Sequence, residues 1–241
     1  MKLRNILAAS ALFAATVPAF AAVTVFDFSN LEYVGGHNTG LLPSEALNSG
    51  YWGCTGGDIC SSNIDGHGHN LGGNLVYTVG GVSATATAQY QTGNHWHDAT
   101  VVQDHENGYS AAHKIGAGLG VYHVVGDNSD DNITSHEKLT LTFAGPVTLS
   151  SVMLRSDGHD TSWDRNATFL LNGTSYKLAD TISPAALTGS VFTFQFGGAK
   201  PDQFYLGGVT VSAVPEPSSY AMLLAGVGLL GFMARRRKPQ A

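Results

Sequence analysis

The stretch Glu137–Leu154 reads EKLTLTFAGPVTLSSVML, and it decides the fold class. Its first half alternates apolar residues, Leu139, Leu141 and Phe143, with threonines. This period of two is typical of a β-strand with one buried face. The alternation resumes beyond Gly145–Pro146. We therefore expect a hairpin that turns at this dipeptide.

The same stretch and a second one give two further signals. Across Ser150–Ser151 the alternation of apolar and polar residues shifts by one position, which indicates a bulge or a strand break. Asn172–Gly173 joins two more short apolar stretches and is a strong signal for a hairpin turn. Many short strands in a chain with 30 glycines predict an all-β fold, an antiparallel β-sandwich of jelly-roll-like type.

The first residues have the layout of an export signal. Lys2 and Arg4 precede an apolar run, and Ala19 and Ala21 fit the small-x-small cleavage rule. We expect residues 1–21 to be a signal peptide. The protein would then be exported through the inner membrane.

The chain contains two cysteines, Cys54 and Cys60, in the glycine-rich stretch WGCTGGDIC. Export places them in an oxidising compartment, where two thiols this close in sequence tend to pair. We predict a disulfide between them. Closing so short a loop would contribute only about 2 kcal/mol, so the disulfide would hold a loop and not the fold.

The charge of the central region excludes one class of partner. Residues 22–213 carry six basic residues against seventeen acidic ones. Such an acidic body repels phosphate backbones, so we expect no nucleic-acid partner.

The C-terminal segment, residues 214–241, reads VPEPSSYAMLLAGVGLLGFMARRRKPQA. No charge occurs over about residues 218–234, and a helix of that length would reach across a thin bilayer. A basic cluster follows at once and would stop the segment on the cytoplasmic side; it consists of Arg235, Arg236, Arg237 and Lys238. We therefore predict a single C-terminal transmembrane helix that anchors the exported domain, residues 22–213.

The segment begins with Pro215, Glu216 and Pro217, which favour an extended, stiff backbone. This tripeptide, the uncharged stretch and the basic cluster together resemble the PEP-CTERM sorting signal of exported bacterial proteins. The resemblance implies that exosortase, an integral membrane transpeptidase, is a partner that cuts near the motif. It further implies a cell-surface or extracellular destination and a link to exopolysaccharide and biofilm. It implies little about the domain upstream, because such tails are attached to many unrelated exported domains.

Two histidine pairs have the form His-x-His, namely His67 with His69 and His95 with His97. On an extended chain each pair would present two imidazoles on one face, a possible start for a zinc or copper site. His105, His113 and Asp98 are the nearest candidates for a third ligand. Solvated or hydrogen-bonded loop histidines are the open alternative.

A second polar cluster leads into the stretch that decides the fold and includes its first residue. It gathers oxygen ligands that suit calcium, namely Asp127, Asp130, Asp131 and Glu137. The spacing is not that of an EF-hand. The alternative is a polar turn whose side chains bond their own backbone. No cofactor is established by these patterns, and calcium is the one that this cluster would suit.

The three tryptophans, Trp52, Trp96 and Trp163, fall in polar contexts, where an indole ring could stack on a sugar. Buried packing at the rim of the domain is the alternative. Known catalytic motifs are missing, and no catalytic residue is predicted. We therefore expect a non-enzymatic surface or matrix protein, glycan-binding or structural. A secreted glycan hydrolase and a histidine-rich metal-binding protein remain as alternatives.

Overall fold

The computed structural model describes residues 22–42, 58–61, 73–106, 116–123, 131–214 and 217–236. The described elements are one 3₁₀ helix (Phe28–Asn30), the helix α1 (Pro217–Arg236) and a set of mostly antiparallel strands. The strands are β1 (Val23–Asp27), β2 (Glu32–Val34), β3 (His37–Thr39), β4 (Ile59–Cys60), β5 (Asn74–Val79), β6 (Val82–Thr92), β7 (His95–Glu106), β8 (Gly116–Tyr122), β9 (Glu137–Arg155), β10 (Thr168–Leu171), β11 (Thr174–Lys177), β12 (Thr181–Ile182), β13 (Leu187–Phe196) and β14 (Tyr205–Ala213). The β-rich class is confirmed, and the jelly-roll-like type stays a prediction.

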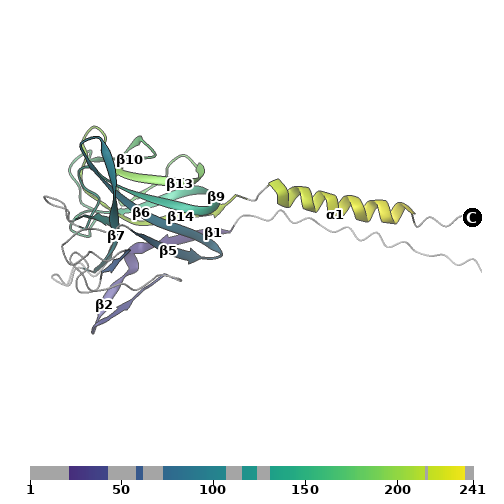
Figure 1. The fold of residues 1–241 in the computed structure, drawn as a ribbon, viewed down its shortest axis with the longest axis horizontal. Coiled ribbons are helices and arrows are strands. Elements are labelled where there is room, and N and C mark those ends of the chain that lie inside the picture. Colours follow the sequence, from purple (N-terminus) through teal and green to yellow (C-terminus); the bar gives the residue numbers. More distant parts are fainter. Residues whose placement is uncertain are drawn as a thin grey trace, which may run out of the picture.

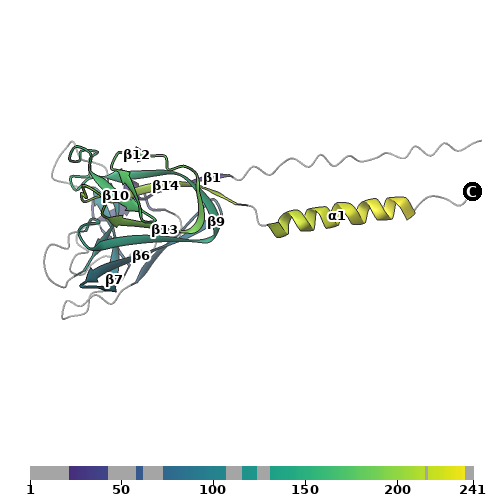
Figure 2. The ribbon, with the colours of Figure 1, turned by 90° about the horizontal axis from the view of Figure 1, so that it is seen from above.

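The stretch that was expected to form a hairpin is one continuous strand, β9. Its two halves pair with β13 and not with each other. The first half also pairs with β6, while the second half pairs with β14 on its other edge. The chain therefore bends at Gly145–Pro146 without reversing onto itself, and Figure 2 shows the bent β9–β13 ribbon at the end nearest α1. The hairpin prediction was wrong because both halves found better partners far away in sequence.

This bend folds a 12-stranded sheet back on itself, so that two layers face each other (Figure 1). β7 is shared in the same way, because its start pairs with β6 and its remainder with β8. Strands that pass from one layer to the other are the usual means of making such corners. A small separate sheet, β2–β3, projects from the domain.

The side-chain pattern of β9 explains how the core forms. Leu139, Leu141 and Phe143 are buried, as expected, and so are four apolar residues of the second half, namely Val147, Leu149, Val152 and Leu154. The predicted bulge is confirmed, because the register with β14 slips between Leu149 and Ser151. The slip returns the apolar side chains of the second half to the inner face.

The predicted hairpin at Asn172–Gly173 is confirmed, since it joins β10 to β11. Both residues have positive φ angles, 50° for the asparagine and 77° for the glycine. This backbone matches the tight turns that suit the right-handed twist of paired strands.

The helix α1 occupies the position that was predicted for a transmembrane helix. Every side chain described in it, from Leu224 to Met233, is exposed. Within the described residues we find no helix that meets the length and hydropathy required to cross a membrane. The predicted signal peptide, residues 1–21, lies outside the described residues.

Replacing Leu141 with alanine should destabilise the fold by about 2–5 kcal/mol, because a fully buried side chain is lost where β9 pairs with both β6 and β13. Urea denaturation of the purified chain measures this. Thr142→Ala is the matched control on the exposed face, with an expected cost below about 1 kcal/mol. Equal costs for both variants would contradict the inward orientation of Leu141.

Candidate functional site

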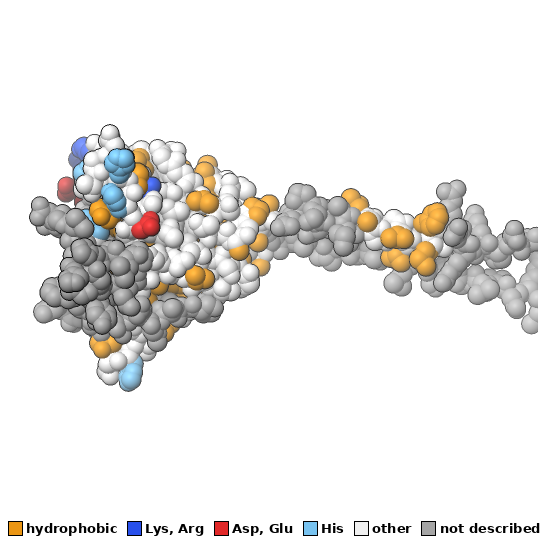
Figure 3. All heavy atoms as spheres, in the orientation of Figure 1, with side chains coloured by type: hydrophobic (Ala, Val, Ile, Leu, Met, Phe, Trp, Pro, Cys, Tyr) orange, Lys and Arg blue, Asp and Glu red, His pale blue; other side chains and the backbone are white. Residues whose placement is uncertain are grey.

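The end of the β-domain away from α1 carries most of the polar side chains of interest. α1 follows the last residue of β14, so the loops before β14 and after β9 lie at the opposite end. The turn between β6 and β7 lies there too, since Tyr90 pairs with Glu137 at the start of β9. Figure 3 shows histidine side chains gathered on this end.

A buried cluster of carboxylates and imidazoles lies inside this end. β7 contributes Asp104 and His105, the segment entering β4 contributes Asp58, and the loop after β9 contributes His159. Asp58 and Asp104 are only 5% and 6% exposed. They are buried because β4 pairs with β7 beside them and covers that part of the strand.

Short contacts join the four side chains into a chain. His105 Nδ1 lies 2.5 Å from Asp58 Oδ1 and 3.8 Å from Asp104 Oδ1. His159 Nε2 donates to the other oxygen of Asp104, Oδ2, at 2.7 Å. The backbone N–H of His105 also donates to Asp58, at 3.3 Å. Asp104 is thus held from two sides by imidazoles that come from different elements.

The surroundings shift the protonation of this cluster. Burial raises the pKa of the Asp104 carboxyl to about 7, and the negative charge of Asp131 adds to the rise, while His159 opposes it. The hydrogen bond to Asp58 raises the pKa of His105. Both groups therefore hold a proton more tightly in the folded chain than in the unfolded one.

The backbone of His159 is unusual for a residue with a side chain, because its φ angle is 59°. Few non-glycine residues adopt this region. The conformation turns the ring inward, where it is 8% exposed and packs edge-on against Tyr205 at 5.5 Å. Tyr205 in turn donates to Asp131 at 2.6 Å. The inward position of His159 is therefore supported by contacts on both sides of the ring.

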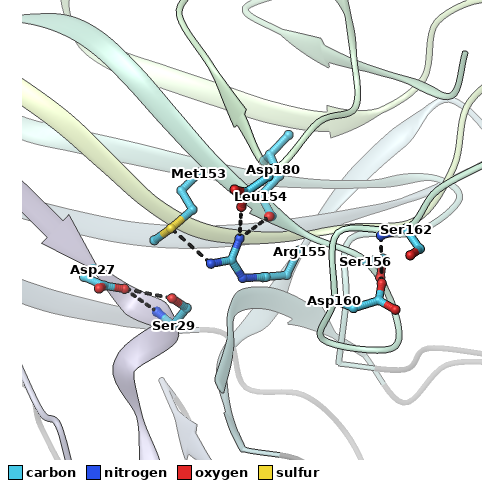
Figure 4. Close-up of polar contacts among 9 residues, drawn as sticks. All are labelled: Asp27, Ser29, Met153, Leu154, Arg155, Ser156, Asp160, Ser162 and Asp180. Carbon is cyan, nitrogen blue, oxygen red and sulfur yellow. Dashed lines mark hydrogen bonds and ion pairs between the residues drawn. The ribbon is translucent and has the colours of Figure 1, made fainter. Parts of the chain in front are cut away.

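The same loop lines a pocket of about 260 Å³, which we call the Trp163 pocket. Its lining consists of Ser156, Asp157, Gly158, Asp160, Ser162, Trp163, Asp202 and Gln203. Asp160 accepts hydrogen bonds from the Ser156 hydroxyl and the Ser162 backbone N–H, which fixes the turn (Figure 4). The pocket combines an indole ring, hydroxyl groups and three carboxylates.

Two neighbours secure the loop. Arg155, the last residue of β9, donates to Asp180 and to the carbonyl of Leu154 (Figure 4). Asn132 donates from its side chain to Asp157 at 2.9 Å. The pocket therefore has a wall that is anchored to the sheet.

The predicted histidine pairs have different outcomes. His67 and His69 lie outside the described residues. His95 and His97 share one face of β7, and His97 stacks on Tyr90 at 5.3 Å. Neither belongs to a group of three potential metal ligands within the described ranges. Of the three candidates for a third ligand, His105 groups with Asp58 and Asp104, Asp98 is exposed on β7, and His113 lies outside the described residues.

Of the predicted calcium ligands, Asp127 and Asp130 lie outside the described residues. Asp131 bonds to Tyr205, as described above. Glu137 is fully buried, accepts from the backbone N–H of Thr134 at 2.9 Å and faces His123 at 3.2 Å. The two described carboxylates have separate partners, and the calcium site stays a prediction.

The tryptophans and cysteines are only partly described. Trp163 lies in the pocket and Trp96 lies under the ammonium group of Lys138, at 3.8 Å, whereas Trp52 lies outside the described residues. Cys60 is buried at the end of β4. Cys54 lies outside the described residues, so the disulfide stays a prediction.

Reasoning from the sequence missed Asp58 and Asp104. Asp104 ends a run in β7 whose six residues, 99 to 104, are all buried. A carboxylate that continues an apolar strand pattern was the available signal. Asp58 gave none, because nothing local indicates that it reaches β7.

Comparison with known proteins assigns the C-terminal segment. Residues 213–238 match the family model of the PEP-CTERM protein-sorting motif. No curated protein and no solved structure matches the chain. The chain therefore carries a PEP-CTERM sorting motif, which marks an exported protein processed by exosortase toward the cell surface. No family is assigned upstream of this motif.

In buffer without divalent metal, the free energy of unfolding should fall as the pH rises from about 4 to about 7. The pKa of Asp104 is raised on folding, so its contribution is complete below the unfolded value and is lost as the pH approaches the folded one. The pKa of His105 is also raised on folding, so His105 likewise lowers the free energy of unfolding as the pH rises, but at higher pH than Asp104. The Asp104 contribution is on the order of 2–4 kcal/mol. Denaturant titrations across this pH range measure it.

Asp104→Asn removes this titration and should flatten the pH dependence. Asp98→Asn is the matched control, because Asp98 is exposed on the same strand. If the parent and the Asp104→Asn chain lost stability equally between pH 4 and pH 7, the cluster would not be the source.

Proposed function

We propose that this chain is a non-enzymatic surface protein whose β-domain, residues 22–213, binds a glycan in the Trp163 pocket. Its C-terminal segment holds it at the membrane until exosortase processes it. The domain is then delivered to the cell surface, where exopolysaccharide is the expected ligand. The observation that carries this proposal is the pocket itself, which places an indole ring beside hydrogen-bonding oxygens.

The chemistry of the pocket suits a sugar. An indole ring offers an apolar face for the C–H groups of a sugar ring, and carboxylates accept hydrogen bonds from its hydroxyls. The volume of about 260 Å³ lies just below the usual range of ligand pockets, about 300–1,000 Å³, and suits a single sugar unit. Trp163 also packs against the core, so its position is fixed before any ligand arrives.

The charge of the pocket narrows the ligand further. Asp157, Asp160 and Asp202 line it, and no lysine or arginine is among its lining residues. Such a pocket repels anionic sugars unless a cation intervenes. We therefore propose a neutral glycan, or an anionic one bridged by calcium.

The position of the pocket fits a protein that is held by its C-terminus. The pocket lies at the end of the β-domain away from α1, because its residues come before β14 and after β9. A ligand could reach it while the C-terminal segment is still attached. The exposed apolar side chains of α1 support the role of that segment as an anchor; they include Leu224, Val227, Leu229, Leu230 and Met233.

Replacing Trp163 with alanine should abolish glycan binding on a glycan array run with and without calcium. The reason is the loss of the stacking surface. Trp96→Ala is the matched control, because this second partly buried indole lies outside the pocket. A thermal unfolding curve for each variant excludes loss of the fold. No binding by the parent chain in either condition would overturn the glycan proposal and leave a structural role.

Replacing Glu216 with alanine should block processing in the producing bacterium. Exosortase would no longer recognise the motif, so the longer form should accumulate in the membrane fraction. Immunoblots of cell fractions with a tag placed after the signal peptide measure both size and location. Lys138→Ala is a control outside the motif. Full-length parent chain in the cytosol would contradict both export and anchoring.

A further inference from the structure

We propose that Asp58, Asp104 and His105 form a binding site for one divalent transition-metal ion, and that zinc fits it best. His159 orients Asp104 and is not itself a ligand. This site is separate from the Trp163 pocket and from both histidine pairs. The two sites share the loop after β9, but none of the three metal ligands lines the Trp163 pocket, so the zinc test and the glycan test are decided separately.

The spacing of the three ligand atoms suits a metal ion. Each residue offers one such atom, and all lie within 4.8 Å of one another. Tetrahedral zinc with bonds of about 2.0–2.2 Å places neighbouring ligand atoms about 3.2–3.6 Å apart. The observed separations from His105 Nδ1, 2.5 Å to Asp58 and 3.8 Å to Asp104, lie on either side of that range. Small rotations of the side chains would bring both into it.

The burial of the cluster also points to a cation. Asp58 and Asp104 are nearly fully buried, and a buried carboxyl group must either hold a proton or face a compensating positive charge. In the described part of the chain, the ion pairs of these two residues are all with histidines. A divalent ion would balance two carboxylates directly and leave His105 neutral, as a metal ligand requires.

His159 has the position of a residue that orients a metal ligand. It donates to Asp104 Oδ2 at 2.7 Å, which leaves Oδ1 facing His105. A hydrogen bond to the carboxylate oxygen that does not bind the metal orients the carboxylate and raises its affinity for the metal. The left-handed backbone of His159 is strained, and it brings the ring to this oxygen.

One side of the site is accessible. The side chain of His105 is 24% exposed, whereas that of Asp58 is 6% exposed. The His105 ring packs edge-on against Tyr33 of the projecting β2–β3 sheet, at 5.8 Å. An ion can therefore enter from the His105 side, and three protein ligands leave a fourth position for water.

The test uses the full chain purified in detergent and stripped of metal with a chelator. Titration with zinc chloride against a chromophoric competitor should show one equivalent bound. Cobalt(II) added in place of zinc should give the visible absorption of a four-coordinate site. This measurement tests the coordination in the parent chain alone and requires no variant. His105→Gln and Asp104→Asn should weaken zinc binding by more than about 100-fold, and His159→Gln by about 10- to 100-fold.

The controls are the double variants His95→Gln with His97→Gln and His67→Gln with His69→Gln, which should bind zinc as the parent does. Circular dichroism confirms that each variant keeps its β-sheet. No stoichiometric binding by the parent would overturn the proposal. Binding that survives in His105→Gln and Asp104→Asn, or that disappears in either control, would overturn it as well.

Discussion

The bend of β9 at Gly145–Pro146 is the constraint on which the rest of the structure depends. One strand contributes to both layers, because its first half pairs with β6 and its second half with β14, while β13 follows it along the other edge. The two layers are therefore connected by backbone hydrogen bonds as well as by side-chain packing. Apolar side chains of both halves meet in one core.

The bend also decides where the loops lie. Since β9 starts and ends away from α1, the residues before and after it meet at that end of the domain. The bulge between Leu149 and Ser151 keeps the buried apolar side chains of the second half on the inner face on both sides of the bulge. The chain that leaves β9 at Arg155 therefore enters the loop of the Trp163 pocket beside β14. Without the bulge, the apolar side chains after it would face solvent.

Local patterns could be predicted from the sequence, and distant pairings could not. The alternation at Leu139, the parity shift at Ser150–Ser151 and the turn at Asn172–Gly173 all depend on neighbouring residues, and all were found in the structure. The hairpin at Gly145–Pro146 was wrong because its alternative depends on β13, more than thirty residues away. Asp58 was missed for the same reason, since its contact with Asp104 and His105 joins segments that the sequence separates.

The loop after β9 links the two candidate sites physically. His159 points inward to Asp104, while Asp157 and Asp160, on either side of it, line the pocket. The turn is closed by the backbone hydrogen bonds between Ser156 and its neighbours in the loop, and by the Asp160 carboxylate. The contact of His159 with Asp104 therefore helps to fix the pocket wall, because these residues share one short stretch of backbone. The buried contact between His159 and Asp104 thus holds the loop whose outer residues line the Trp163 pocket. Recognition residues often lie on loops that a fixed scaffold positions in this way.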